Sequence, residues 1–154
     1  MRLTLLRHGL AVDREDWTGP DPLRPLTSAG QVRTRDVCRA LRRLIRAERI
    51  LHSPWLRAVQ TAEIAARVWD LPMEEVPWLA GEFLSPVSII AKLPPGDLVL
   101  VGHEPDLGAL CGALMGTGPV ALKKAGVAML VGMPQPGGMV LTALLSPKVV
   151  LGVR

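Results

Sequence analysis

The sequence contains few aromatic residues and few cysteines. Only 3% of its 154 residues are aromatic, with four Trp, one Phe and no Tyr. Proteins that stack single-stranded nucleic acid on aromatic rings need more of these side chains, so no such binding surface is expected. Cys38 and Cys111 are too few and too far apart for a zinc knuckle or a CxxC redox motif. We expect them to be two buried thiols in a reducing compartment.

The chain also lacks an unbroken hydrophobic segment of membrane-spanning length. Its longest uncharged stretch is Ala125–Pro147, and two Pro and two Gly lie near its centre, within Met133–Gly138. These residues would break a helix in lipid, so two strands and a turn are expected instead. Arg7 and His8 interrupt the first apolar residues, which argues against a signal peptide. We therefore expect a cytoplasmic protein with no membrane partner.

The overall composition is that of a globular protein, and the length suits a single domain spanning residues 1–154. Hydrophobic residues make up 49% of the chain and charged residues 21%, with a net charge of +4. Seven of the arginines lie between Arg33 and Arg49. We interpret them as one solvated helix face rather than a nucleic-acid surface, with docking of an acidic partner as the lesser alternative. A monomer or weak dimer is expected.

Strand and helix patterns alternate along most of the chain. Apolar runs predict strands over 2–6, 49–52 and 97–101, a weaker strand at 75–76, and further strands over 120–122, 127–131, 139–145 and 149–153. Helical patterns cover 28–47, with Thr27 as N-cap, and 54–69, with Ser53 as cap; shorter helices are expected over 86–92 and 105–115. This order predicts a three-layer α/β/α sandwich with a mostly parallel central sheet, an antiparallel edge and no large cap insertion.

Ionisable groups follow three of the predicted strands, where parallel α/β sheets carry their sites. Arg7, His8 and Gly9 follow the first strand, Arg57 lies in the first turn after the second, and His103 follows the buried strand. Arg offers a planar fork of donors suited to phosphate, and a helix N-terminus also favours anions. Gly9 would let the backbone approach a ligand closely. Together these residues predict an oxyanion pocket.

Three sequence blocks resemble the histidine phosphatase superfamily, which has the phosphoglycerate-mutase-like fold. They are Leu6-Arg7-His8-Gly9, the run SPWLRAVQTA from Ser53 to Ala62, and Val101-Gly102-His103. The segment RPLTSAG from Arg24 to Gly30 and the run Gly102-His103-Glu104-Pro105 are similar to the short SixA-type phosphohistidine phosphatase branch. The blocks occur in the family's order and cover residues 2 to about 115.

The resemblance implies a role for each matching residue. His8 would attack phosphorus and become a transient phosphohistidine, which requires a neutral imidazole. Arg7, Arg57 and His103 would hold the phosphoryl oxygens, with Gly9 beside them. Neither a metal nor a cofactor is implied, since the cationic side chains would take the place of a metal ion. His52 matches no catalytic position and is expected to be structural.

The sequence leaves the general acid and the substrate open. Glu82, Glu104 and Asp21 are candidates to protonate the leaving group, or no acid is needed because a P–N bond is labile. With only a short segment between Leu79 and Gly96, the pocket should be shallow and open, which favours phosphohistidine in proteins. The alternatives are a phosphatase or mutase acting on small phosphomonoesters and, in another class, a non-catalytic phosphate- or nucleic-acid-binding module.

Overall fold

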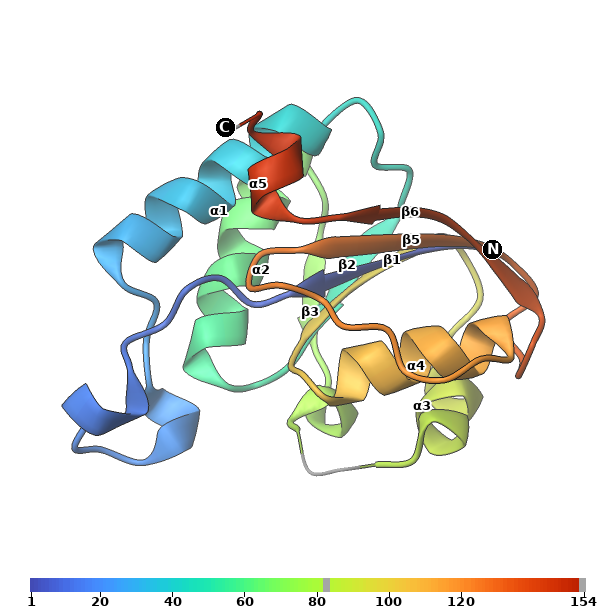
Figure 1. Cartoon of the computed structure of the whole chain (residues 1–154), viewed down its shortest axis with the longest axis horizontal. Helices are drawn as coiled ribbons and strands as arrows, with labels where there is room; N and C mark the ends of the chain where they lie inside the picture. Colours follow the sequence, from blue (N-terminus) through green and yellow to red (C-terminus); the bar gives the residue numbers. More distant parts are fainter. Residues whose placement is uncertain (82–83, 153–154) are drawn as a thin grey trace.

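A six-stranded mixed sheet forms the centre of the molecule (Figure 1). The computed structural model describes residues 1–81 and 84–152. The strands are β1 (Arg2–Arg7), β2 (Arg49–His52), β3 (Met73–Glu75), β4 (Leu98–Gly102), β5 (Val127–Gly132) and β6 (Met139–Leu145), in the order β3-β2-β4-β1-β5-β6. The first four in this order are parallel, and β5 is antiparallel to both β1 and β6. The predicted mostly parallel sheet with an antiparallel edge is confirmed.

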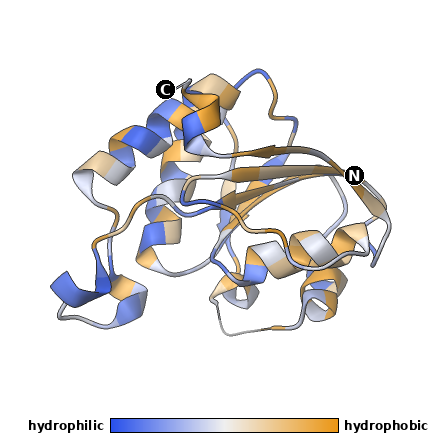
Figure 2. Cartoon of the chain, viewed as in Figure 1, coloured by the Kyte–Doolittle hydropathy of each residue, from blue (hydrophilic) through white to orange (hydrophobic). Residues whose placement is uncertain are grey.

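Helices cover both faces of the sheet and complete the predicted three layers. On one face lie α1 (Ser28–Leu41), α2 (Leu56–Trp69) and the short α5 (Pro147–Val150), and on the other α3 (Pro86–Lys92) and α4 (Asp106–Met115). Single 3-10 turns occur at Arg14–Asp16, Asp21–Leu23 and Pro77–Leu79. The strands are largely hydrophobic and α1 is largely hydrophilic on its outer side (Figure 2). No large insertion interrupts this arrangement among the residues that the structure describes.

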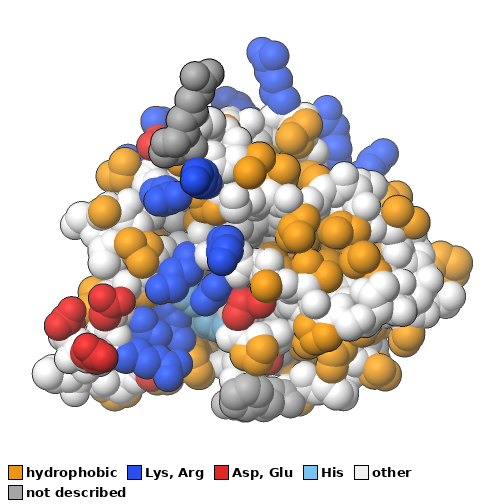
Figure 3. Space-filling model, in the orientation of Figure 1, with side chains coloured by type: hydrophobic (Ala, Val, Ile, Leu, Met, Phe, Trp, Pro, Cys, Tyr) orange, Lys and Arg blue, Asp and Glu red, His pale blue; other side chains and the backbone are white. Residues whose placement is uncertain are grey.

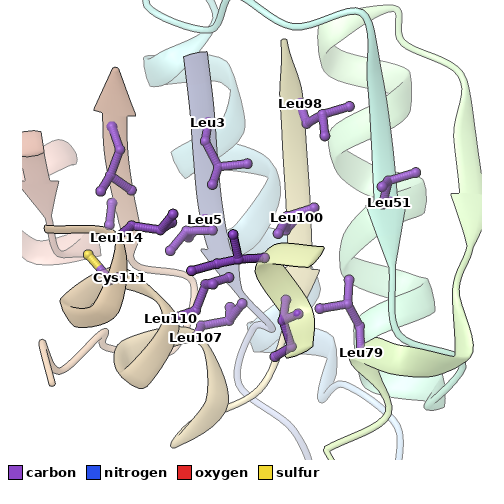
Figure 4. Close-up of a cluster of buried hydrophobic side chains, with 14 of the residues drawn as sticks. Leu3, Leu5, Leu51, Leu79, Leu98, Leu100, Leu107, Leu110, Cys111 and Leu114 are labelled. Atoms are coloured by element: carbon purple, nitrogen blue, oxygen red, sulfur yellow. The ribbon is translucent and has the colours of Figure 1, made fainter. Parts of the chain in front are cut away.

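Alternation of side chains along the central strands divides the interior into two cores. Leu3 and Leu5 of β1 pack with Leu107 and Leu110 of α4 (Figure 4). Leu6 points to the other face and belongs to the core beneath α1 and α2. Because successive residues of a strand face opposite sides, a short apolar run such as this one serves both layers. The run is fixed at the centre of the sheet, between β4 and β5.

The first helix begins where the sequence predicts and ends earlier. The Thr27 hydroxyl accepts a hydrogen bond from the Gly30 amide at 2.9 Å, so Thr27 is the N-cap. The helix stops at Leu41 rather than continuing to residue 47, because the Leu44 amide bonds back to Leu41 in a tighter, three-residue turn. Leu44 is consequently exposed, whereas Ile45 turns into the core.

The second helix starts three residues after the predicted cap. Leu56 is its first residue and Trp55 precedes it without a side-chain cap. The Ser53 hydroxyl does accept a hydrogen bond from the Trp55 amide at 3.1 Å, but this closes a turn ahead of the helix. The expectation that Ser53 caps this helix is therefore wrong.

Two of the predicted strands, 120–122 and 149–153, are not strands over the residues that the structure describes; residue 153 lies outside them. Residues 120–122 run along α4, where the Val120 amide donates to the Gly108 carbonyl at 3.0 Å. The segment after β6 forms α5, with Ser146 as its cap and Pro147 at its first position. This start signal outweighs the β propensity of the Val residues that follow. None of the helices in the described part of the chain is long and apolar enough to cross a bilayer.

Candidate active site

Three neighbouring parallel strands bring the two expected histidines together. β2, β4 and β1 are adjacent, so their carboxyl ends meet at one edge of the sheet. The His8 amide donates to the Gly102 carbonyl at 3.0 Å, which ties the end of β1 to the end of β4. The imidazole rings of His8 and His103 lie 5.2 Å apart between centroids.

The His8 ring is held in one tautomer and kept neutral. Its Nδ1 lies 2.8 Å from the Gly9 carbonyl oxygen, which can only accept, so Nδ1 carries the proton and Nε2 the lone pair. Burial, opposed in part by this hydrogen bond and reinforced by the charges around it, lowers the pKa of His8 to about 3. The ring is only 6% exposed, so it is recessed rather than at the open surface expected from the sequence.

His103 is fixed by a serine and an indole. Its Nε2 lies 2.7 Å from the Ser53 hydroxyl, and the Trp55 ring packs 4.8 Å from it between centroids. Its Nδ1 is buried and has no hydrogen-bond partner within the described residues. Burial and the neighbouring Arg57 lower the pKa of His103 to about 3. Both histidines are therefore neutral at physiological pH.

Two buried or partly buried guanidinium groups stand beside the histidines. Arg57, in the first turn of α2, is 3% exposed and lies over the Trp55 ring at 4.7 Å. Its terminal nitrogens donate to the Asp21 carbonyl at 2.9 Å and to the Asp21 carboxylate at 3.1 Å. Arg7 donates to the Leu122 carbonyl at 2.9 Å. Arg7 is thus anchored through one terminal nitrogen of its guanidinium, and Arg57 through both.

Asp21 serves these arginines and is poorly suited to donate a proton. Its carboxylate also accepts from Arg24 at 2.9 Å, and Arg24 is itself buried. Burial alone would raise the pKa of Asp21, but the hydrogen bonds and charges of Arg24 and Arg57 outweigh this effect and lower it. The carboxylate therefore stays ionised and holds the loop over α2.

Gly9 packs against α1. A Cβ atom at this position would collide with the Thr34 hydroxyl, and the Gly9 amide donates to the Thr61 hydroxyl at 3.0 Å. Thr61 in turn donates to the Arg57 carbonyl at 2.7 Å. Gly9 does not line the cavity described next, so the geometry gives it a packing role that the sequence did not suggest.

These side chains surround a cavity of about 570 Å³, which we call the histidine cavity. Arg7, His8, Arg57 and His103 all line it, so four of the predicted site residues are brought together. Further cations line it as well, namely Arg14, Arg24 and Lys124. In Figure 3, Lys and Arg side chains gather around the pale blue of a histidine on this face. The cavity is therefore built for an anion.

Three carboxylates reach the same cavity: those of Asp13, Glu104 and Asp106. The oxygens of Glu104 accept hydrogen bonds from the Gly108 amide at 2.7 Å and the Leu122 amide at 3.4 Å, so Glu104 has a structural task. Asp106 opens α4, and burial raises its pKa. Glu82, the first candidate for the acid, lies outside the described residues.

Sequence reasoning missed Ser53 and Asp106 as members of the site. Ser53 was assigned to a helix cap, although its place directly after a parallel strand signals a position at the sheet edge. Asp106 follows His103 by three residues, at the start of a helix, which places both at the same strand end. His52 is buried, with its Nδ1 2.9 Å from the Ser53 carbonyl, and it does not line the cavity.

No group of three or more His, Cys, Asp or Glu side chains within residues 1–81 and 84–152 is arranged to hold a metal ion.

The sequence matches a known protein family: the family model described as histidine phosphatase superfamily (branch 1) matches residues 3–81. The chain belongs to this superfamily. It is a phosphatase of the class that works through a histidine.

Known proteins similar to this histidine phosphatase support the SixA-type branch. The protein histidine phosphatase SixA, solved in complex with tungstate, has a TM-score of 0.80 and 27% identity over 96% of this chain and 97% of its own. A protein from Agrobacterium tumefaciens proposed to be a SixA phosphohistidine phosphatase has a TM-score of 0.79 and 24% identity over 95% and 97% of the two chains. An uncharacterized Picosynechococcus sp. protein is 44% identical over 137 residues, which is 82% of each chain.

More distant enzymes share the fold alone. The phosphoserine phosphatase of Entamoeba histolytica, solved with 3-phosphoglyceric acid, has a TM-score of 0.69 and 18% identity over 97% of this chain and 98% of its own. At this identity the likeness carries no information on substrate. It does show that the three-layer architecture of this histidine phosphatase is that of the phosphoglycerate-mutase-like enzymes.

Proposed function

We propose that this protein hydrolyses phosphohistidine in other proteins, through a transient phosphohistidine on its own His8. The observation that carries the proposal is the state of His8. Its ring is neutral, the Gly9 carbonyl oxygen fixes the proton on Nδ1, and cationic side chains line the same cavity. A neutral imidazole with a free Nε2 lone pair is a competent nucleophile toward phosphorus.

In the first step, the Nε2 lone pair of His8 forms a bond to phosphorus. The bond between phosphorus and the leaving nitrogen or oxygen breaks, and the leaving atom keeps the electron pair and takes up a proton. In the second step, water attacks the phosphorus of phospho-His8 and loses a proton. The P–N bond breaks, inorganic phosphate leaves, and the Nε2 lone pair is restored. No oxidant or reductant is involved in either step.

The three other predicted residues stabilise the phosphoryl oxygens. Arg7 and Arg57 supply charged donors whose guanidinium groups are already held by protein oxygens, so little ordering is needed when the phosphoryl group arrives. The unpartnered Nδ1 of His103 supplies a neutral donor if Ser53 donates its proton to Nε2. These two guanidinium groups and the His103 donor support a reaction without a metal cofactor.

The choice of substrate rests on the shape and the carboxylates of the cavity. His8 is recessed and no large insertion covers the strand ends within the described residues, so a side chain projecting from a partner's surface can reach it. The P–N leaving group makes little demand on a general acid, which suits a site where Glu104 and Asp21 are committed to other bonds. The likeness to SixA supports the same substrate class.

The test compares wild-type protein with His8→Ala on a phosphohistidine peptide, p-nitrophenyl phosphate and glycerol phosphate. We expect the highest kcat/KM on the peptide, no turnover by the variant, and a labelled adduct on wild type that is acid-labile and alkali-stable. EDTA should leave the rates unchanged. A folded His8→Ala variant with normal activity would refute the covalent route, and preference for glycerol phosphate would refute the substrate class.

A further inference from the structure

A second pocket lies next to the histidine cavity. It encloses about 500 Å³, and five of the side chains that line it are cationic: Arg7, Arg33, Lys123, Lys124 and Lys148. We call it the basic pocket. Its lining contains no carboxylate. A cluster of this size without counter-charge, in a chain with a net charge of only +4, creates a positive potential that attracts anions.

The cations of the basic pocket come from four separate parts of the fold. Arg7 ends β1, Arg33 lies on α1, Lys123 and Lys124 belong to the loop before β5, and Lys148 lies on α5. These residues are far apart in the sequence, so their convergence is a product of the fold and was not evident from the arginine run of α1. None of the five takes part in an ion pair among the residues that the structure describes.

The basic pocket and the histidine cavity are continuous. Arg7 and Lys124 line both of them, and a substrate group bound at His8 would therefore border the basic pocket. Figure 3 shows Lys and Arg side chains in a band that crosses this face and reaches the histidine. One substrate molecule can thus contact both the histidine cavity and the basic pocket.

The kind of cation indicates the kind of anion. Arg33, Lys123, Lys124 and Lys148 are exposed, so the pocket provides hydrated charges on long side chains, three of them lysine point charges, instead of buried forks of donors. Buried donors would be needed to hold a small free anion tightly. Exposed charges around a recess favour association with a macromolecule of opposite charge, whose carboxylates keep part of their hydration.

We propose that the basic pocket binds acidic side chains that flank the phosphohistidine on a partner protein. This inference rests on the proposed function, because it assigns the partner of the same active site. Phosphohistidine would enter the histidine cavity while neighbouring Asp or Glu side chains contact Lys123, Lys148 and Arg33. The pocket would then select among phosphoproteins by the charge around their histidine.

The test uses two synthetic histidine peptides of equal length, phosphorylated with phosphoramidate. One has Asp and Glu on both sides of the histidine, and the other has Ser and Gly. We expect wild type to show a KM for the acidic peptide about tenfold below that for the neutral one, with similar kcat. Raised ionic strength should remove the difference, because exposed charges are screened.

The variant is Lys123→Glu combined with Lys148→Glu, two exposed residues outside the histidine cavity. Lys148→Glu places an acidic residue in the first turn of α5, so stability should be kept. The double variant should lose the preference for the acidic peptide and keep its rate on p-nitrophenyl phosphate. A matched control is Arg35→Glu with Arg42→Glu, which makes the same change in charge in a groove between α1 and α2. The control should retain the preference.

The possible results distinguish the docking role of the basic pocket, the kind of molecule that occupies it and the substrate class of the active site. Equal KM values for the two peptides on wild type, or equal loss of preference in the control, would overturn the docking role of the basic pocket. Faster turnover of a small bisphosphate than of the acidic peptide, abolished in the double variant, would overturn a protein as the occupant. Hydrolysis of p-nitrophenyl phosphate with neither peptide cleaved would instead refute the proposed substrate class.

Discussion

Two neutral histidines lie beside one buried and one partly buried guanidinium group, those of Arg57 and Arg7. Burial makes a proton on His8 or His103 unfavourable, and the neighbouring cations add to the effect. The lowered pKa keeps the Nε2 lone pair of His8 free at neutral pH, and the neutral ring is the form that attacks phosphorus. The residues that bind phosphate therefore also keep the nucleophile ready.

Ser53 is predicted to act through His103. The Ser53 oxygen accepts from the Trp55 amide, and its hydroxyl proton is then directed at His103 Nε2, which leaves the ring protonated at Nδ1. We expect Ser53→Ala to lower kcat about tenfold, with less effect on KM. Nitrogen-15 NMR should show one His103 tautomer in wild type and a mixture in the variant.

The control for this prediction is Ser88→Ala, which removes a hydroxyl that pairs with Ser85 on α3. It should change neither kcat nor the histidine spectrum. An unchanged His103 tautomer in Ser53→Ala, with kcat unaffected, would show that the serine does not position the ring.

Asp106 is the described carboxylate best placed to protonate a leaving group. It lines the histidine cavity, and burial raises its pKa, so it holds a proton more readily than an exposed aspartate. We expect Asp106→Asn to reduce turnover of an alkyl phosphate about 100-fold, and to affect phosphohistidine and p-nitrophenyl phosphate much less. Glu82→Gln measured in parallel decides between the two candidates. If Glu82→Gln alone gives this pattern, the acid is Glu82.

At the scale of elements, α4 sets the position of Arg7 through residues 120–122, which lie against this helix. Gly108 accepts from the Val120 amide at 3.0 Å, and the Leu122 carbonyl that follows anchors the Arg7 guanidinium. A Cβ atom at Gly108 would collide with the Val120 carbonyl. The small residue therefore lets the segment approach the helix closely, and that approach positions Arg7.

Gly108→Ala should consequently destabilise the protein, although the same change in an isolated helix is favourable. We expect the free energy of unfolding to fall by about 1–3 kcal/mol, as for other overpacked sites, and kcat/KM to fall with it as Arg7 shifts. Denaturant titration and steady-state kinetics measure both. Gly118→Ala is the control, since a Cβ atom there meets nothing within 4 Å. Increased stability of Gly108→Ala would contradict the close approach.

Local patterns predicted most of these elements, and contacts between distant segments decided the rest. The Ser-Pro pair before α5 starts a helix as such pairs should, but the same pair at Ser53 does not, because the Ser53 oxygen accepts from the Trp55 amide and closes a turn ahead of the helix. His8, Arg57 and His103, in contrast, can be recognised as site residues from the sequence blocks that resemble the histidine phosphatase superfamily. The basic pocket was not, because Lys123 and Lys148 converge only in the folded chain.

For the whole molecule, the two neutral histidines make stability depend on pH. The unfolded chain binds a proton at each histidine near pH 6.5, and the folded chain does so only near pH 3. Between these values the unfolded state takes up more protons, so the free energy of unfolding falls as pH falls. The loss should be about 2 kcal/mol for each histidine between about pH 7 and about pH 5.

Urea titrations across this range test the prediction. His8→Asn should remove the contribution of one histidine and so flatten the pH dependence, while the same change at His103 should act similarly. Asp21 acts in the same direction at lower pH: its lowered pKa stabilises the fold above about pH 4, and this stabilisation is lost below it. A stability that is constant from pH 7 to 5 would show that the histidines titrate normally in the folded protein.

The central position of β1 has a consequence for how the protein is made. This strand carries the nucleophile at its end, yet its partners are Leu98–Gly102 on one side and Val127–Val131 on the other. A ribosome delivers both partners long after the strand itself, so its apolar residues emerge without a sheet to join. During synthesis, the order of the sequence thus leaves this central strand waiting for both neighbours, and His8 reaches its place only when most of the chain has been translated.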